Sequence, residues 1–221
     1  MDFAEARENM VDRLARGSSV DDDVAEALRT VPRHEFVPDD RREDAYKDRP
    51  LPIGGGQTVS APHMVAEMCA VLDPEAGDEV LEVGTGSGYH AAITAELVGD
   101  DGAVYTVEYD ETLAAEARET LDRLGYDDVA VRCGDGRDGW PEKAPFDRAY
   151  LTCAVPEFPP PILDQLRTGG VALAPVGTLR QQLVFARVDD TGEIADCEHH
   201  GPVQFVRVRG ADGADEDDGA G

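Results

Sequence analysis

Short apolar segments alternate with segments of helical periodicity from residue 64 onward, and this alternation constrains the fold more than any other feature. We expect helices at residues 64–72, 91–98, 111–124 and 162–166, and strands at residues 80–83, 104–107, 129–133 and 149–152. Strand–helix alternation at this spacing indicates a parallel sheet that helices cover on both faces. The sequence therefore predicts an α/β fold.

The C-terminal part departs from that alternation. Three further strands are expected at residues 171–174, 183–188 and 203–208, which brings the sheet to seven strands. Because no helical segment separates the last two, we expect them to form an antiparallel hairpin at one edge of a mostly parallel sheet.

Two short helices are expected ahead of the sheet. Phe3, Met10 and Leu14 fall on one helical face, and the acids that begin at Asp21 provide an N-cap for a second helix. Residues 33–62 are rich in proline and glycine, so we expect an ordered loop or an extended arm there. The predicted division of the chain is an N-terminal segment 1–62, a sheet domain 63–209 and a disordered acidic tail 210–221.

Glycines and acids stand at the ends of three successive expected strands. Gly84, Gly86 and Gly88 follow the first strand, Glu108 ends the second, and Gly134-Asp135-Gly136 follows the third. Glycine lets the backbone pass close to a ligand, and an acid at the end of the second strand can accept hydrogen bonds from a ribose. Together these residues predict a site for a cofactor that contains a nucleoside.

The spacing of the glycines favours one such cofactor. Dinucleotide sites prefer G-x-G-x-x-G before a helix that binds a diphosphate, whereas this turn reads G-x-G-x-G and follows Glu82 by two residues. A carboxylate there suits a cationic ligand without phosphate. We therefore favour S-adenosylmethionine over a nicotinamide dinucleotide.

A second motif lies in the proline- and glycine-rich segment, Pro50-Leu51-Pro52-Ile53-Gly54-Gly55-Gly56-Gln57-Thr58-Val59-Ser60-Ala61-Pro62-His63-Met64. A hydroxyl near the start of a helix can bind a carboxylate together with free backbone N–H groups. It can equally well cap the helix. The spacing alone leaves both interpretations open.

With Ala45-Tyr46 and Asp48 ahead of it, this motif resembles the signature of the protein-L-isoaspartate O-methyltransferase family. The resemblance covers roughly residues 10 to 209, and further matches are Val31-Pro32-Arg33-His34-Glu35-Phe36-Val37-Pro38, Ala144-Pro145-Phe146-Asp147 and Gln165-Leu166-Arg167-Thr168-Gly169-Gly170. It implies a Rossmann-like methyltransferase fold. It also implies methyl transfer from S-adenosylmethionine, which leaves S-adenosylhomocysteine, to the free α-carboxyl of L-isoaspartyl residues in damaged proteins or peptides.

The resemblance also implies the roles of individual residues. Ser60 matches the active-site serine of the family, and Thr58, Ala61 and His63 lie in the segment that meets the substrate. The matches to its cofactor contacts are Gly54, Gly55, Gly56, Glu82, Gly84, Gly86, Gly88, Glu108, Tyr109, Asp135 and Gly136. Since a carboxylate acceptor is already ionised at neutral pH, we expect Ser60 to orient it by a hydrogen bond and not to act as a nucleophile.

The segment Phe205-Val206-Arg207-Val208-Arg209 departs from the family, which has an aromatic or apolar pair followed by Pro-Leu. Arginines there can clasp an acidic peptide or the isoaspartyl carboxylate, or can lie on the solvent side of an edge strand. The change leaves two alternatives open, a related methyltransferase with another carboxylate or small-molecule acceptor and an inactive cofactor-binding paralogue.

The composition limits the partners and the environment. With 47 acidic and 20 basic residues, the formal charge is -27, which repels nucleic acid and anionic membranes. Acid spread along the chain favours a very salty cytoplasm, as in a halophilic archaeon. The N-terminus lacks a secretory signal, the four cysteines are far apart, and the five histidines have no metal-ligand spacing. We therefore expect a cytoplasmic monomer with free thiols and no metal.

Overall fold

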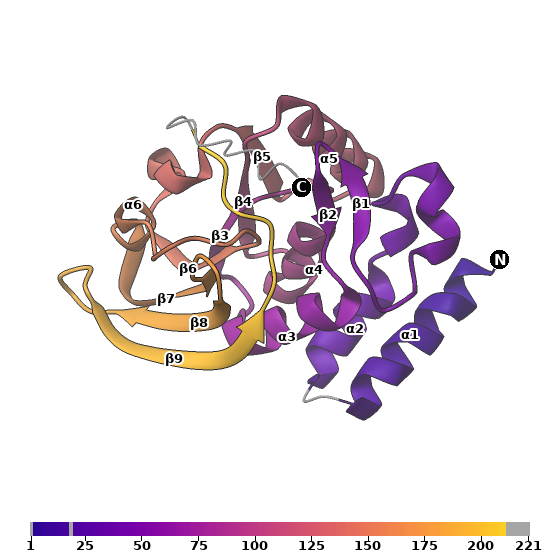
Figure 1. The fold of residues 1–221 in the computed structure, drawn as a ribbon, viewed down its shortest axis with the longest axis horizontal. Helices are drawn as coiled ribbons and strands as arrows, with labels where there is room; N and C mark the ends of the chain where they lie inside the picture. Colours follow the sequence, from indigo (N-terminus) through magenta and orange to yellow (C-terminus); the bar gives the residue numbers. More distant parts are fainter. Residues whose placement is uncertain (1, 18–19, 211–221) are drawn as a thin grey trace.

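A seven-stranded sheet forms the centre of the computed structural model, which describes residues 2–17 and 20–210 (Figure 1). The strand order is β5-β4-β3-β6-β7-β8-β9. The strands are β3 (Glu79–Val83), β4 (Ala103–Glu108), β5 (Val129–Cys133), β6 (Phe146–Leu151), β7 (Leu166–Val176), β8 (Gln181–Val188) and β9 (Ile194–Val203). The first five pair in parallel, and β8 and β9 are antiparallel to their neighbours. The predicted fold class and the antiparallel C-terminal hairpin are confirmed.

Apolar side chains leave the sheet in both directions and form two cores. Val80, Val104 and Tyr150 belong to one core, with the helices α3 (Pro62–Leu72), α4 (Tyr89–Val98) and α5 (Glu111–Leu124). On the other face, Leu81 and Val107 pack with the short helix α6 (Pro160–Leu163) and neighbouring loops. Burial on both faces explains why the central strands are almost uniformly apolar.

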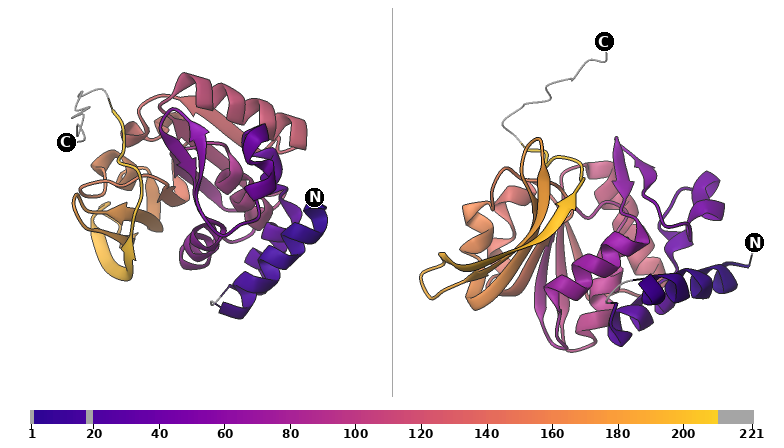
Figure 2. Two further views of the ribbon diagram at one scale, coloured as in Figure 1. Left: turned by 45° about the vertical axis from the view of Figure 1, so that its right-hand side comes forward. Right: turned by 60° about the horizontal axis from the view of Figure 1, so that its bottom comes forward.

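Two N-terminal helices lie outside α4, at the opposite end of the molecule from the β8–β9 hairpin (Figures 1 and 2). They are α1 (Phe3–Gly17) and α2 (Asp22–Thr30), and both were predicted. The Asp21 side chain caps α2 by accepting a hydrogen bond from the Val24 N–H at 2.8 Å. The boundary predicted after residue 62 lies one residue inside α3, which begins at Pro62, and the division into domains stays a prediction.

The segment between α2 and α3 has more regular structure than the sequence indicates. It contains two short 3₁₀ helices and the hairpin of β1 (Leu51–Gly54) and β2 (Gln57–Val59). The buried Arg33 guanidinium holds this segment, because its Nε donates to the Ala45 carbonyl at 2.8 Å and its charge lies 4.9 Å from the Tyr89 ring centre. Strands of three or four residues are too short to give a periodic signal.

The last strand was predicted in the wrong place. The structure has β9 at Ile194–Val203, and residues 204–210 run on in extended form with a single bridge between Ala154 and Arg207. Most residues of β9 are exposed, and its middle carries the polar side chains of Asp196, Glu198, His199 and His200, so the edge strand lacks the apolar alternation that marks a half-buried strand. The apolar run at 205–208 instead packs Val206 and Val208 against the second core.

The predicted acidic tail from residue 210 lies, apart from that first residue, outside the described residues. Among the described residues, no helix combines the length and the apolar character that crossing a membrane requires.

Candidate cofactor and acceptor site

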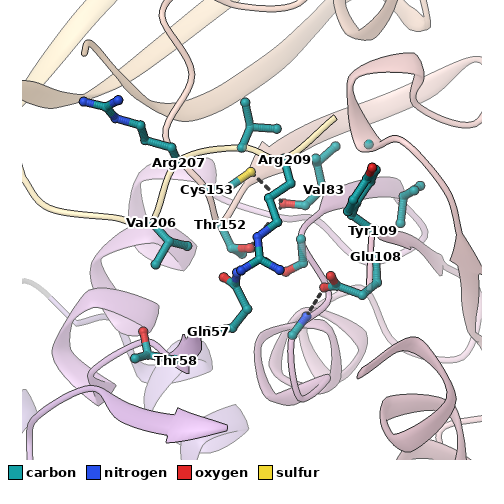
Figure 3. Close-up of a pocket in the computed structure, with 15 residues that line it drawn as sticks. Gln57, Thr58, Val83, Glu108, Tyr109, Thr152, Cys153, Val206, Arg207 and Arg209 are labelled. Atoms are coloured by element: carbon teal, nitrogen blue, oxygen red, sulfur yellow. Dashed lines mark hydrogen bonds between the residues drawn. The ribbon is translucent and has the colours of Figure 1, made fainter. Parts of the chain in front are cut away.

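The carboxyl ends of the parallel strands open into a cavity (Figure 3). Val83 stands at the end of β3 and Glu108 at the end of β4, while Thr152 and Cys153 follow β6. In open parallel sheets this edge is the usual place for a ligand. The full lining is Gln57, Thr58, Val83, Gly84, Gly86, Val107, Glu108, Tyr109, Gly136, Thr152, Cys153, Val206, Arg207, Val208 and Arg209.

The turn from β3 into α4 requires glycine for its shape. Gly84, Gly86 and Gly88 have φ of 97°, 54° and 86°, which L-residues with a side chain rarely adopt. A β-carbon on Gly84 would also collide with the Thr152 hydroxyl, which donates to the Gly84 carbonyl at 2.5 Å. The turn therefore brings bare backbone to the floor of the cavity.

Glu108 connects this turn to the end of β4. One carboxylate oxygen accepts from the Gly86 N–H at 2.8 Å (Figure 3), and the other accepts from the Asp110 N–H at 3.0 Å. The residue is 7% exposed and lines the cavity. Each oxygen keeps a lone pair for a further donor, so the carboxylate can bind a pair of hydroxyls such as those of a ribose.

Glu82 lies behind the turn and is not among the described residues that line the cavity. It is fully buried in β3, where it accepts from the Tyr150 hydroxyl at 2.9 Å and from the Thr106 hydroxyl at 2.5 Å. The Thr106 hydroxyl also bonds that of Thr85, in the turn, at 2.6 Å. Burial raises the pKa of Glu82 to about 8. In this structure Glu82 therefore reaches the turn through two threonines, not the cavity itself.

A second, larger cavity adjoins the first. It measures about 550 Å³ and is lined by Ser60, Ala61 and His63, together with residues 202–206 of the C-terminal part. Thr58, Thr152 and Val206 line both cavities. The four residues that the sequence analysis assigned to catalysis and to the substrate thus line one cavity, which meets the smaller cavity at a shared wall.

His63 is held at the mouth of the larger cavity by Asp48. One Asp48 oxygen lies 2.9 Å from His63 Nδ1 and accepts from the His63 backbone N–H at 3.0 Å. A carboxylate on Nδ1 orients the ring and leaves Nε2 for another partner.

The smaller cavity thus presents a carboxylate with free lone pairs, and the larger one presents a hydroxyl and an imidazole. The model of the protein-L-isoaspartate(D-aspartate) O-methyltransferase family matches residues 5–213 of the chain. The chain belongs to this family.

Similar curated proteins agree with that assignment. Protein-L-isoaspartate O-methyltransferase 2 of Archaeoglobus fulgidus is 49% identical over 210 residues, which are 95% of each chain. The protein-L-isoaspartate O-methyltransferase of Methanopyrus kandleri is 50% identical over 217 residues, 97% of this chain and 96% of that one.

Solved structures match as well. A protein-L-isoaspartate O-methyltransferase structure is 30% identical with a TM-score of 0.86, and the match covers 92% of this chain and 66% of that one. A Plasmodium falciparum protein described as a beta-aspartate methyltransferase, in complex with S-adenosyl-L-homocysteine, has a TM-score of 0.79 at 24% identity, which shows the shared fold.

The residues that match the family's cofactor contacts do not all meet in one place. The structure brings some of them to the smaller cavity and leaves the others outside its lining. Glu108, Tyr109, Gly84, Gly86 and Gly136 line the smaller cavity. The remaining predicted contacts, which are not among its described lining residues, are Gly54, Gly55, Gly56, Glu82, Gly88 and Asp135.

Asp135 is paired with a neighbour instead. Its carboxylate lies 2.7 Å from Arg137 Nη2, and it caps the turn of residues 136–138 by accepting from the Arg137 N–H at 3.0 Å. Gly136, by contrast, lines the cavity. It packs so closely against Val83 that a β-carbon on residue 136 would collide with the Val83 side chain.

Sequence reasoning missed several cavity residues. Gln57 was quoted only as part of the loop motif, and Thr152 carries no motif of its own. Cys153 is not among the predicted site residues, and the structure places it in the cavity wall. Burial raises the pKa of this thiol to about 12, so it stays protonated and does not act as a nucleophile.

Proposed function

We propose that this chain transfers the methyl group of S-adenosylmethionine to the free α-carboxyl of L-isoaspartyl residues in damaged proteins, which starts repair through a methyl ester and a succinimide. The observation that carries the proposal is the pair of adjoining cavities, one containing Glu108 and the other Ser60, with Thr58, Thr152 and Val206 in their common wall. Two reactants bound in adjoining cavities are held in a fixed orientation toward each other. Positioning of this kind lowers the activation barrier by about 7 kcal/mol or more. The activity is the one that the family and its named relatives share.

The residues of the smaller cavity fit this cofactor chemically. The Glu108 carboxylate suits the ribose hydroxyls, the apolar walls at Val83 and Val107 suit flat or sulfur-bearing groups, and the glycine backbone permits close approach. S-adenosylmethionine supplies an electrophilic methyl group on a sulfonium, and its transfer to a carboxylate oxygen leaves neutral S-adenosylhomocysteine and an ester.

The chain's own residues orient the acceptor. Ser60 follows β2 and stands just before α3, where Pro62 has no N–H and the His63 N–H already donates to Asp48, so a side-chain donor has to meet the acceptor here. We propose that the Ser60 hydroxyl donates to the acceptor carboxylate, while His63, fixed by Asp48, contacts the peptide beside it. The carboxylate needs no general base because it is ionised at neutral pH.

The test is methyl transfer from labelled S-adenosylmethionine, in high salt, to an isoaspartyl peptide and to the matching aspartyl peptide. We expect label in the isoaspartyl peptide alone, and we expect Ser60→Ala to lower the rate about 10²-fold while the affinity for S-adenosylhomocysteine stays the same. Label in neither peptide, with the cofactor bound, would point to another acceptor. An unchanged rate in Ser60→Ala would remove the hydroxyl from the mechanism.

We also propose the setting in which the enzyme acts. The charge of -27 supports a saline cytoplasm, as in a halophilic archaeon, and disfavours nucleic acid and anionic membranes as partners. Among the described residues, the large apolar side chains that are exposed are Tyr109, Leu179 and Ile194. So little exposed apolar surface supports a monomer.

A further inference from the structure

A short extended segment crosses the mouth of the cofactor cavity. We call residues 204–210 the C-terminal strap. Its backbone is anchored at Ala154, whose N–H donates to the Val206 carbonyl at 2.7 Å and whose carbonyl accepts from the Val208 N–H at 2.9 Å. The Gln181 side chain holds the beginning of the strap with two hydrogen bonds to the Phe205 backbone, at 2.6 and 3.0 Å. The strap is therefore fixed on the β6 side of the cavity.

Arg209 carries the strap across to the opposite wall (Figure 3). Its Nη2 donates to the Gly55 carbonyl, in the β1–β2 turn, at 2.7 Å. The Gln57 side-chain amide is oriented with its oxygen toward Arg209, which satisfies both the oxygen and the nitrogen of the amide. The oxygen then accepts from Arg209 Nη2 at 3.1 Å and from Nε at 3.3 Å. Both acceptors are uncharged, and within the described part of the chain no carboxylate lies within ion-pair distance of Arg209.

The guanidinium fills space that a ligand would need. Arg209 lies in the middle of the cavity lining, between Gln57 and Glu108, whereas Arg207, two residues earlier in the strap, points away (Figure 3). The cavity that remains measures about 60 Å³. Pockets that bind small molecules and cofactors measure about 300 to 1,000 Å³. A nucleoside cofactor therefore needs more space than this conformation provides, and the Arg209 side chain occupies part of that space.

We propose that Arg209 is a removable plug of the cofactor cavity, and this inference rests on the proposed function. Three hydrogen bonds from an exposed guanidinium to two neutral oxygens are weak enough for a ligand to break. While they are formed, only the fraction of molecules with Arg209 withdrawn can bind. That fraction lowers the apparent affinity and the association rate by the same factor.

The test measures binding of S-adenosylhomocysteine and S-adenosylmethionine to the full-length wild type, Arg209→Ala, Arg209→Lys and Arg180→Ala. Arg180 is exposed in the turn between β7 and β8, so its removal changes the net charge equally without opening the cavity. Association rates come from surface plasmon resonance and dissociation constants from calorimetry, both in high salt.

We expect Arg209→Ala to bind both ligands about tenfold faster and about tenfold more tightly than the wild type, and Arg180→Ala to match the wild type.

Equal or weaker binding by Arg209→Ala would overturn the plug. A gain confined to S-adenosylmethionine that Arg209→Lys does not share would also overturn it, because that pattern indicates repulsion of the sulfonium charge. If no variant bound either ligand, the proposed function would fail together with the plug, whereas equal tight binding by all variants would contradict the plug alone.

Discussion

Glu82 and Glu108 carry the same carboxyl group, and their surroundings decide what each can do. Glu108 accepts hydrogen bonds from two backbone N–H groups beside the cavity, and its remaining lone pairs can accept from a ligand there. Glu82 has no solvent around it, and burial raises its pKa to about 8. At neutral pH Glu82 is therefore largely uncharged and serves to hold Thr106 and, through it, the glycine turn.

This difference predicts a pH dependence of stability. Between its ordinary pKa near 4.5 and its native pKa of about 8, Glu82 keeps a proton in the folded chain that it loses in the unfolded chain. Its stabilising contribution is full below pH 4.5 and is lost as the pH rises through 8. In Glu82→Gln this titration is absent. The amide can accept from Tyr150 and donate to the Thr106 oxygen, and the Thr106 hydroxyl then donates to Thr85 instead of to residue 82.

We therefore expect the free energy of unfolding of the wild type to fall, relative to that of Glu82→Gln, by up to roughly 3 kcal/mol between pH 5.5 and 8. Urea unfolding of both proteins across this range measures the difference, and all other titrating groups cancel in it. Parallel pH profiles would show that Glu82 is ionised in the native state.

At the scale of elements, the turn between β3 and α4 can be separated from an ordinary glycine turn nearby. Gly77 and Gly84 both have positive φ, of 90° and 97°. A β-carbon on Gly77 would meet open space, whereas one on Gly84 would strike the Thr152 hydroxyl. The two positions share the backbone strain and differ in the contact with the site.

Alanine at either position should cost about 1 to 2 kcal/mol of stability, because a side chain is unfavourable at positive φ. Only Gly84→Ala should also weaken the binding of S-adenosylhomocysteine, by about tenfold or more, since the turn must shift away from Thr152. Urea unfolding and calorimetry of the two variants check both expectations. Equal ligand affinities in the two variants would mean that the turn does not contact the cofactor.

The elements also show what a sequence can and cannot predict. The strands that lead into the site are buried on both faces and stand out as short apolar runs. The helices α1, α2 and α5 each have one apolar face, so their periodicity predicts them. The β1–β2 hairpin is too short for periodicity, and β9 is an exposed edge strand whose position depends on its pairing with β8. The site follows the same division. Ser60 and Glu108 belong to local motifs, whereas the inward position of Arg209 depends on Ala154, far away in the chain.

At the scale of the whole molecule, the dominant property is the charge of -27. Repulsion among acidic side chains destabilises the compact state, and salt screens it over a length of about 10 Å at 0.1 M and about 3 Å at 1 M. We expect the melting temperature to rise by several degrees or more between about 0.1 M and about 2 M KCl. Melting curves in which the midpoint does not move would contradict a chain adapted to a saline cytoplasm.

The account as a whole depends on a nucleoside cofactor lying at the ends of β3 and β4 with its ribose on Glu108. The most direct measurement is the dissociation constant of S-adenosylhomocysteine for the wild type and Glu108→Gln, by calorimetry in high salt. Glu111→Gln, at the exposed first position of α5, removes the same charge as a control. We predict binding by the wild type and by Glu111→Gln, and binding weakened about tenfold or more in Glu108→Gln, whose amide would face backbone N–H groups with a donor. No binding by the wild type, or equal binding by all three proteins, would contradict the account.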